Sequence, residues 1–193
     1  MKPTLRTFVA VEMDEAIRRA AARSIEELRS ASADVTWVAP HNMHLTVKFL
    51  GDVAAEKIPQ VCEAVAQAVA DTEPFDLEVR GVGAFPNAAR PRTIWLGLGA
   101  GERELAALAG RIESALEKLG FAREARGFHG HLTLGRVRRP SPALAALTPL
   151  LKNKSDFEAG LTPIDEVVVF SSQLSPAGPT YEALSRAPLV GGK

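Results

Sequence analysis

The chain has 193 residues, 46% of them hydrophobic and 24% charged, and its 23 Lys and Arg residues balance 23 Asp and Glu residues. This composition is typical of a globular domain with an apolar core, and it excludes a disordered or fibrous protein. A net charge of zero excludes a general attraction to polyanions, so any contact with a nucleic acid must be local.

The first part of the sequence alternates strand and helix patterns. Residues 7–13 are rich in β-formers, and from Asp14, which can serve as a helix N-cap, apolar residues recur at helical spacing as far as Arg29. The following elements are predicted as strands over 35–38 and 44–50, a helix over 54–70 and a strand over 75–83. Phe8 to Val11, the first apolar stretch, is too short for a signal peptide or a membrane span.

The second part repeats this order of elements. The patterns predict a strand over 93–98, a helix over 102–119, a strand over 131–137, a helix over 142–151 and a strand over 166–170. Thr7 precedes His44 by nearly the same number of residues as Thr93 precedes His131. This repetition indicates an internal duplication.

The repeat predicts an α+β fold with two lobes related by a pseudo-twofold axis. Each lobe is expected to contain a small, largely antiparallel sheet, and the two sheets face each other across a cleft with helices on their outer faces. We expect one domain over residues 1–193, with halves of roughly 1–84 and 93–193 and a loop-rich crossover at about 85–92. The lone cysteine, Cys62, cannot form an internal disulfide, which favours the cytoplasm, and nothing demands more than a monomer.

Both halves contain a His-x-Thr-x motif, His44-Leu45-Thr46-Val47 and His131-Leu132-Thr133-Leu134. In a strand, His and Thr two residues apart point to the same face, while the aliphatic residue between them points into the core. A duplicated fold brings two such strands together, so two imidazoles and two hydroxyls are expected to meet in one cleft.

Two facing imidazoles suit in-line displacement at phosphorus. One neutral histidine can take a proton from the entering oxygen while its charged partner protonates the leaving oxygen. The hydroxyls of Thr46 and Thr133 can donate to the non-bridging oxygens, and this chemistry requires neither a metal nor a cofactor. One motif alone fits an ordinary strand, but two copies at equivalent positions, using two of only four histidines, favour a catalytic role.

The sequence resembles, nearly from end to end, the two-histidine phosphoesterases, and among them the bacterial and archaeal RNA 2',3'-cyclic phosphodiesterases once called 2'-5' RNA ligases. The resemblance implies that His44 is the proton donor, that His131 activates water as the proton acceptor, and that opening of the cyclic phosphate on an RNA end leaves a 2'-phosphate. Reversible 2'-5' joining of RNA ends is a further implication. Besides the two motifs, the residues that carry the resemblance are Arg6 to Val11, Asn42-Met43 before the first motif and Lys48 to Gly51 after it, Phe85-Pro86, Pro91 to Trp95, Gly135-Arg136, Ser172 to Leu174 and Gly178 to Tyr181.

One position departs from the pattern of that family. The family usually has Phe-Arg-Pro-His where this chain reads Phe128-His129-Gly130-His131, so a guanidinium is missing beside the second motif. His129 either replaces it as a donor to the phosphate or caps the strand, and both interpretations stay open. Arg136, in a short basic run after the second motif, is a candidate for contact with RNA phosphates.

Three other side chains near the motifs have competing interpretations. Lys48 shares the strand parity of His44 and Thr46, so it either extends the anion site or is simply solvated. Tyr181 and Phe49 are candidates for stacking on a terminal base, although core packing is the simpler assignment for Phe49.

The sequence thus predicts a metal-independent phosphodiesterase acting on RNA 2',3'-cyclic phosphate ends. Two alternatives remain. One is a nucleotide or RNA-end binding module without turnover. The other is a metal-dependent phosphohydrolase, in which His129 and His131 chelate a metal together with His44.

Overall fold

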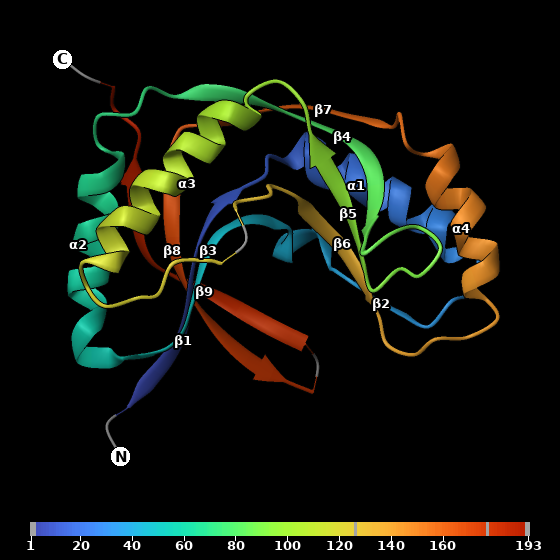
Figure 1. The fold of residues 1–193 in the computed structure, drawn as a ribbon, viewed down its shortest axis with the longest axis horizontal. Coiled ribbons are helices and arrows are strands. Elements are labelled where there is room, and N and C mark those ends of the chain that lie inside the picture. The colour runs from blue at the N-terminus through green and yellow to red at the C-terminus, as the bar shows by residue number, and fades with distance from the viewer. Residues whose placement is uncertain (1–2, 126, 177, 192–193) are drawn as a thin grey trace.

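The computed structural model describes residues 3–125, 127–176 and 178–191, and within them nine strands form one curled sheet (Figure 1). The strand order is β7-β4-β5-β6-β3-β1-β8-β9, with β2 paired to β6 beside this path. All pairings between these strands are antiparallel, as the sequence predicts. The strands are β1 (Thr4–Glu12), β2 (Val35–Trp37), β3 (His44–Ala54), β4 (Phe75–Phe85), β5 (Thr93–Leu98), β6 (Leu132–Val137), β7 (Glu158–Ile164), β8 (Glu166–Ser175) and β9 (Gly178–Pro188).

The prediction of two separate sheets is wrong. Strands β3 and β6, which carry the two motifs, are hydrogen-bonded neighbours, and their pairing of Leu45 with Leu132 joins the two ends of the sheet. Each end also mixes strands from both sequence halves: β1 and β3 lie with β8 and β9, whereas β4 lies with β5, β6 and β7. This pairing of β3 with β6 satisfies backbone N–H and C=O groups that would stay unpaired if each motif strand were the edge of a separate sheet.

The helices cover the face of the sheet that points away from the histidines. Most of their buried residues belong to the same core cluster as Leu45 and Leu132. Helix α1 packs on β7 and against α4, and α2 packs on α3, so the helices form two pairs that lie at opposite ends of the view in Figure 1. The expectation of outer helices is therefore confirmed. The helices are α1 (Glu15–Arg29), α2 (Ile58–Val69), α3 (Glu102–Glu117) and α4 (Leu144–Asn153), with single 3-10 turns at Pro40–Asn42 and Ala55–Lys57.

Alternating residues of β1 define the two faces of the sheet. Val9 and Val11 are fully buried and belong to the main core, which the helices cover. Phe8 and Ala10 belong to a second, smaller cluster, which includes Phe170 and packs against Tyr181. The aromatic rings of this second cluster support the face on which the motif side chains stand.

The strands that the sequence does not predict, β7 and β9, are the two edges of the sheet. Both contain residues that weaken a strand pattern: Gly160 and Pro163 in β7, and Pro179 and Pro188 in β9. Proline lacks the amide hydrogen that a central strand would have to donate, but an edge strand can leave that position unpaired. The N-cap assigned to Asp14 is confirmed, because its Oδ1 accepts a hydrogen bond from the Ile17 amide at 2.8 Å.

Candidate active site

The two motifs lie side by side on β3 and β6. Leu45 and Leu132 are fully buried and face each other in the antiparallel register, while the flanking histidines and threonines are partly exposed on the opposite face. In this register His44 lies beside Thr133, and Thr46 lies beside His131. The alternating pattern therefore brings two imidazoles and two hydroxyls together, as the sequence predicts.

Both motif strands carry a bulge immediately after the threonine. Against β1, Thr46 pairs with Ala10 and Lys48 with Val9, so Val47 is the extra residue in β3. Against β5, Thr133 pairs with Trp95 and Gly135 with Ile94, so Leu134 is the extra residue in β6. Because a bulge reverses the alternation of side chains, the third residue after each threonine returns to the cleft face.

The bulges explain two differences from the sequence-based expectations. Lys48 neither extends the anion site nor is solvated, because its side chain is 3% exposed and its Nζ donates to Glu113 Oε1 at 2.7 Å and to the Ala122 carbonyl at 2.9 Å. The prediction that Phe49 packs in the core is likewise wrong, since Phe49 is 56% exposed and lines the cleft. At the equivalent position of β6, Arg136 also lines the cleft.

A backbone carbonyl orients each catalytic candidate in the same way. His44 Nδ1 lies 2.8 Å from the Asn42 carbonyl oxygen, and His131 Nδ1 lies 2.9 Å from the His129 carbonyl oxygen. A carbonyl oxygen can only accept a hydrogen bond, so Nδ1 of each ring is the protonated nitrogen. Nε2 of each ring is then the atom that takes up or releases a proton.

Aromatic rings surround both imidazoles. His44 contacts Phe8 at 4.8 Å and Tyr181 at 5.1 Å between ring centroids, and His131 contacts Phe85 at 5.1 Å and Trp95 at 6.4 Å. Burial among these rings lowers the pKa of both histidines below the usual value, because it disfavours the charged form. The hydrogen bonds that the two rings donate to the backbone carbonyls raise the pKa and so act in the opposite direction.

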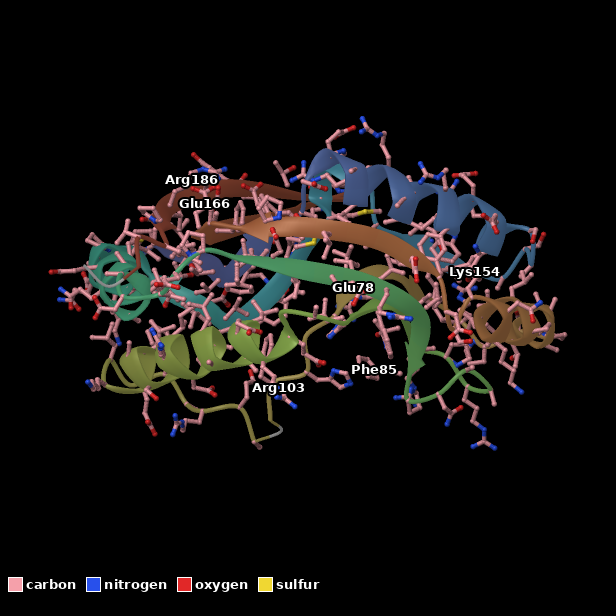
Figure 2. The ribbon with its side chains drawn as sticks, turned by 90° about the horizontal axis from the view of Figure 1, so that it is seen from above. Glu78, Phe85, Arg103, Lys154, Glu166 and Arg186 are labelled. Atoms are coloured by element: carbon pink, nitrogen blue, oxygen red, sulfur yellow. The ribbon has the colours of Figure 1, made fainter. Side chains whose placement is uncertain are left out.

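Charged neighbours distinguish the two histidines. Glu12 lies opposite His44 in the β1–β3 register, and its carboxylate raises the pKa of His44 against the effect of burial. Around His131 the charges are positive, so His129 and Arg136 add to burial in lowering its pKa. Glu12 is itself held by Arg186, at 2.7 Å, and Figure 2 shows Arg186 next to its second partner, Glu166.

A cavity of about 350 Å³ opens over the first motif. Its lining brings His44, Thr46, Thr133 and Arg136 together, and it adds the side chains of Arg6 and Tyr181. His131 contributes to the same face of the sheet but does not line this cavity. The hydroxyls of Thr46 and Thr133 have no hydrogen-bond partner within the described ranges, so they are available to a ligand.

His129 lies at the β6 side of the cleft. It is exposed, and its ring contacts Phe85 at 5.4 Å and Trp95 at 6.0 Å. Its carbonyl holds His131, so the residue has a positioning role through its backbone that sequence reasoning missed. Whether its side chain also contacts a phosphate stays a prediction.

Sequence reasoning also missed the role of Asn42. This residue links the first motif to the β9 hairpin, because its Nδ2 donates to the Pro179 carbonyl at 3.0 Å while its own carbonyl accepts from His44. The available signals were its position two residues before a candidate histidine and its place in the segment that carries the family resemblance. Within residues 3–125, 127–176 and 178–191, no group of three or more His, Cys, Asp or Glu side chains is arranged to hold a metal ion.

A curled antiparallel sheet that presents two His-x-Thr pairs from adjacent strands defines a two-histidine phosphoesterase. The family model of the 2'-5' RNA ligase superfamily matches residues 17–175. The chain belongs to this superfamily.

Comparisons with individual proteins agree with this assignment. An RNA 2',3'-cyclic phosphodiesterase of Archaeoglobus fulgidus is 37% identical over 180 residues, which cover 93% of this chain and 98% of that protein. A crystal structure of a Thermus thermophilus protein matches with a TM-score of 0.82 at 27% identity, covering 97% of this chain and all of the other. Escherichia coli LigT in complex with 3'-AMP matches with a TM-score of 0.74 at 25% identity, covering 97% and 99% of the two chains.

Proposed function

We propose that this chain is an RNA 2',3'-cyclic phosphodiesterase that opens the cyclic phosphate to a 2'-phosphate. The observation that carries the proposal is the matched pair of imidazoles, each anchored through Nδ1 and each beside a free threonine hydroxyl. The full-length relatives named RNA 2',3'-cyclic phosphodiesterase support the substrate.

His131 takes the proton of the attacking water and His44 protonates the leaving 3'-oxygen. Water adds to phosphorus as the bond to the 3'-oxygen breaks, so the product carries a 2'-phosphate and a 3'-hydroxyl. The charge around each ring supports this division, because Glu12 favours a protonated His44, whereas nearby cations favour a neutral His131. Thr46 and Thr133 donate to the non-bridging oxygens, where negative charge builds up.

The test is turnover of a short RNA that ends in a 2',3'-cyclic phosphate, in the presence of EDTA. We expect the wild type to form the 2'-phosphate, and His44→Ala or His131→Ala to lower kcat by about 10²- to 10⁴-fold, as the loss of a general acid or base does. His41→Ala is the matched control, because His41 is an exposed histidine in the turn before β3 and has no part in the mechanism.

Two results would replace the proposal with its alternatives. Binding of the RNA end without turnover in any condition indicates a recognition module. Inactivity in EDTA that a divalent metal reverses indicates a metal-dependent phosphohydrolase, with His129 and His131 as ligand candidates.

Joining of RNA ends uses the same proton transfers in the same cleft. A 5'-hydroxyl takes the place of water, attacks phosphorus and displaces the 3'-oxygen, which yields a 2'-5' linkage. Water at its bulk concentration outcompetes a dilute RNA end, so we expect hydrolysis to dominate. Incubation of the enzyme with concentrated RNA ends, followed by analysis of the linkage, tests for the joining reaction.

The described helices include none that is long and apolar enough to cross a membrane. A cytoplasmic location, a monomeric state and a single duplicated domain over residues 1–193 stay predictions from the sequence. Sedimentation of the purified chain tests the monomeric state.

A further inference from the structure

Two arginines line the cavity without a carboxylate partner. Arg6 on β1 and Arg136 on β6 are both exposed at the cavity, and neither forms an ion pair within the described part of the chain. The only hydrogen bond of the Arg136 side chain there is to Thr93 Oγ1, at 3.3 Å. Among the described residues, none that lines the cavity is an Asp or Glu. Two unneutralised guanidinium groups in a cavity without acidic side chains form a site for an anion.

Two side-chain hydroxyl groups, those of Ser172 and Tyr181, line the same cavity on the strands beyond Arg6. Ser172 on β8 pairs with Tyr181 on β9, and the β1–β8 register, which pairs Thr7 with Ser171, places Arg6 beside Ser172. Tyr181 lines the cavity together with both arginines; burial raises the pKa of its phenol, and the charges of Arg136 and Arg6 act in the opposite direction. Neither hydroxyl has a hydrogen-bond partner within the described ranges. The site therefore offers two charged and two neutral donors from four different strands.

The proposed mechanism places the reacting phosphate beside the motif histidines, where Thr46 and Thr133 provide the donors. The two arginines and the hydroxyls of Ser172 and Tyr181 are therefore not used by it. An RNA end carries a second phosphate on the 5' side of its terminal nucleoside, either in the linkage to the preceding nucleotide or as a terminal monoester. A cavity of about 350 Å³ is at the lower end of the range for small-molecule sites, so it suits one nucleotide unit rather than a folded RNA.

We infer that Arg6, Arg136, Ser172 and Tyr181 form a second anion subsite, which binds the 5'-phosphate of the nucleotide that carries the cyclic phosphate. The inference rests on the proposed phosphodiesterase function and specifies its substrate. An RNA end that carries this phosphate is bound at two points, whereas a nucleoside 2',3'-cyclic phosphate without it is bound at one.

The experiment compares kcat/KM for three substrates with the same terminal base. These are adenosine 2',3'-cyclic phosphate, its 5'-phosphorylated form, and a diadenylate that ends in the cyclic phosphate. We expect both substrates with a 5'-phosphate to be preferred by about 10- to 100-fold per guanidinium contact, the range for a hydrogen bond to a charged group. A preference for the diadenylate alone identifies the internucleotide linkage as the ligand, and a preference for the monoester alone identifies a terminal phosphate.

Arginine variants separate this subsite from the catalytic groups. Arg6→Gln should reduce the preference for a 5'-phosphate about 10-fold or more, and Arg6→Lys should restore part of it because a positive charge remains. Arg103→Gln is the matched control, since Arg103 is exposed in the first turn of α3 and does not line the cavity.

A neutral linkage provides an independent check. A methylphosphonate in the diadenylate removes the charge, so it should reduce kcat/KM of the wild type but have little further effect on Arg6→Gln. An equal preference in the wild type and in Arg6→Gln, or no preference in a wild type that hydrolyses all three substrates, would overturn the subsite and leave the phosphodiesterase proposal intact. Failure to hydrolyse any of the three would instead overturn the proposed function.

Discussion

Replacement of Lys48 by methionine should destabilise the protein through a contact that connects the first motif strand to the segment before the second. The Lys48 side chain is 3% exposed, and its ammonium group donates to Glu113 on α3 and to the Ala122 carbonyl. Glu113 also accepts from the Glu124 amide at 2.8 Å, so one carboxylate holds β3 and the chain that leads to His131. Methionine keeps most of the aliphatic packing and removes only the charge and its hydrogen bonds.

The expected loss is about 2 kcal/mol in the free energy of unfolding. Removal of one partner of a fully buried pair costs about 3–5 kcal/mol, but Glu113 is 23% exposed and water can hydrate it in the variant. The charged hydrogen bonds themselves contribute about 1.5–3 kcal/mol. With a urea dependence of about 2 kcal/mol per molar, the unfolding midpoint should fall by roughly 1 M.

A lower pH should reduce the difference in the free energy of unfolding between the wild type and Lys48→Met. Burial raises the pKa of Glu113, but the hydrogen bonds from Lys48 and from the Glu124 amide, with the charges of Lys48 and Arg123, outweigh it and leave the pKa below its usual value. The carboxylate therefore stabilises the fold above the pKa that it has in the unfolded chain. This contribution disappears as the pH falls through the lower pKa of the folded state.

Urea titrations of Lys48→Met at neutral and acidic pH test this reasoning. Arg19→Met is the control: its Nη1 lies 3.4 Å from Glu15 Oε1, but the two side chains are 64% and 70% exposed, so less than about 1 kcal/mol should be lost. Equal losses in the two variants, or a loss in Lys48→Met that does not change with pH, would refute the argument from burial.

Three further predictions concern catalysis. Because the pKa of both histidines is lowered, the bell-shaped pH profile of kcat/KM should have its maximum below about pH 6.5. Glu12→Gln should lower the pKa of His44 further and so move the alkaline limb of this profile to lower pH. NMR titration of the His44 ring can follow that shift. Thr46→Val and Thr133→Val should each lower kcat by about 10²-fold with little change in KM, and serine should restore activity at either position. Phe49→Ala should raise KM by about 5- to 100-fold for substrates with any terminal base, the range for one lost stacking contact, whereas Phe49→Tyr should behave like the wild type.

The parts of the site that follow from local chemistry could be predicted from the sequence. The two motifs identify the strands, and the alternation of side chains in a strand places histidine and threonine on one face. The face of the sheet to which the side chains of Lys48 and Phe49 point could not be predicted in this way. A bulge depends on how two strands pair, and the sequence of β3 alone does not reveal the extra residue opposite β1.

The sheet was less predictable than the site. Its central strands have long apolar patterns, but the edge strands β7 and β9 are interrupted by glycine and proline, whose effect on a strand depends on its position in the sheet. The continuity of the sheet rests on the pairing of Leu45 with Leu132, two residues that any buried strand could contain. Helix positions were easier, because their apolar spacing and the cap at Asp14 are local signals.

The position of β1 between β3 and β8 has a consequence for how the protein is made. Thr7 pairs with Ser171, so one edge of the first strand stays unpaired until most of the chain has left the ribosome. Contacts between residues so distant in sequence slow folding, because the entropy of closing a long loop must be overcome before the contact forms. Assembly of the sheet is therefore expected to follow synthesis, and the exposed edge of β1 in the nascent chain is a natural place for a chaperone to bind.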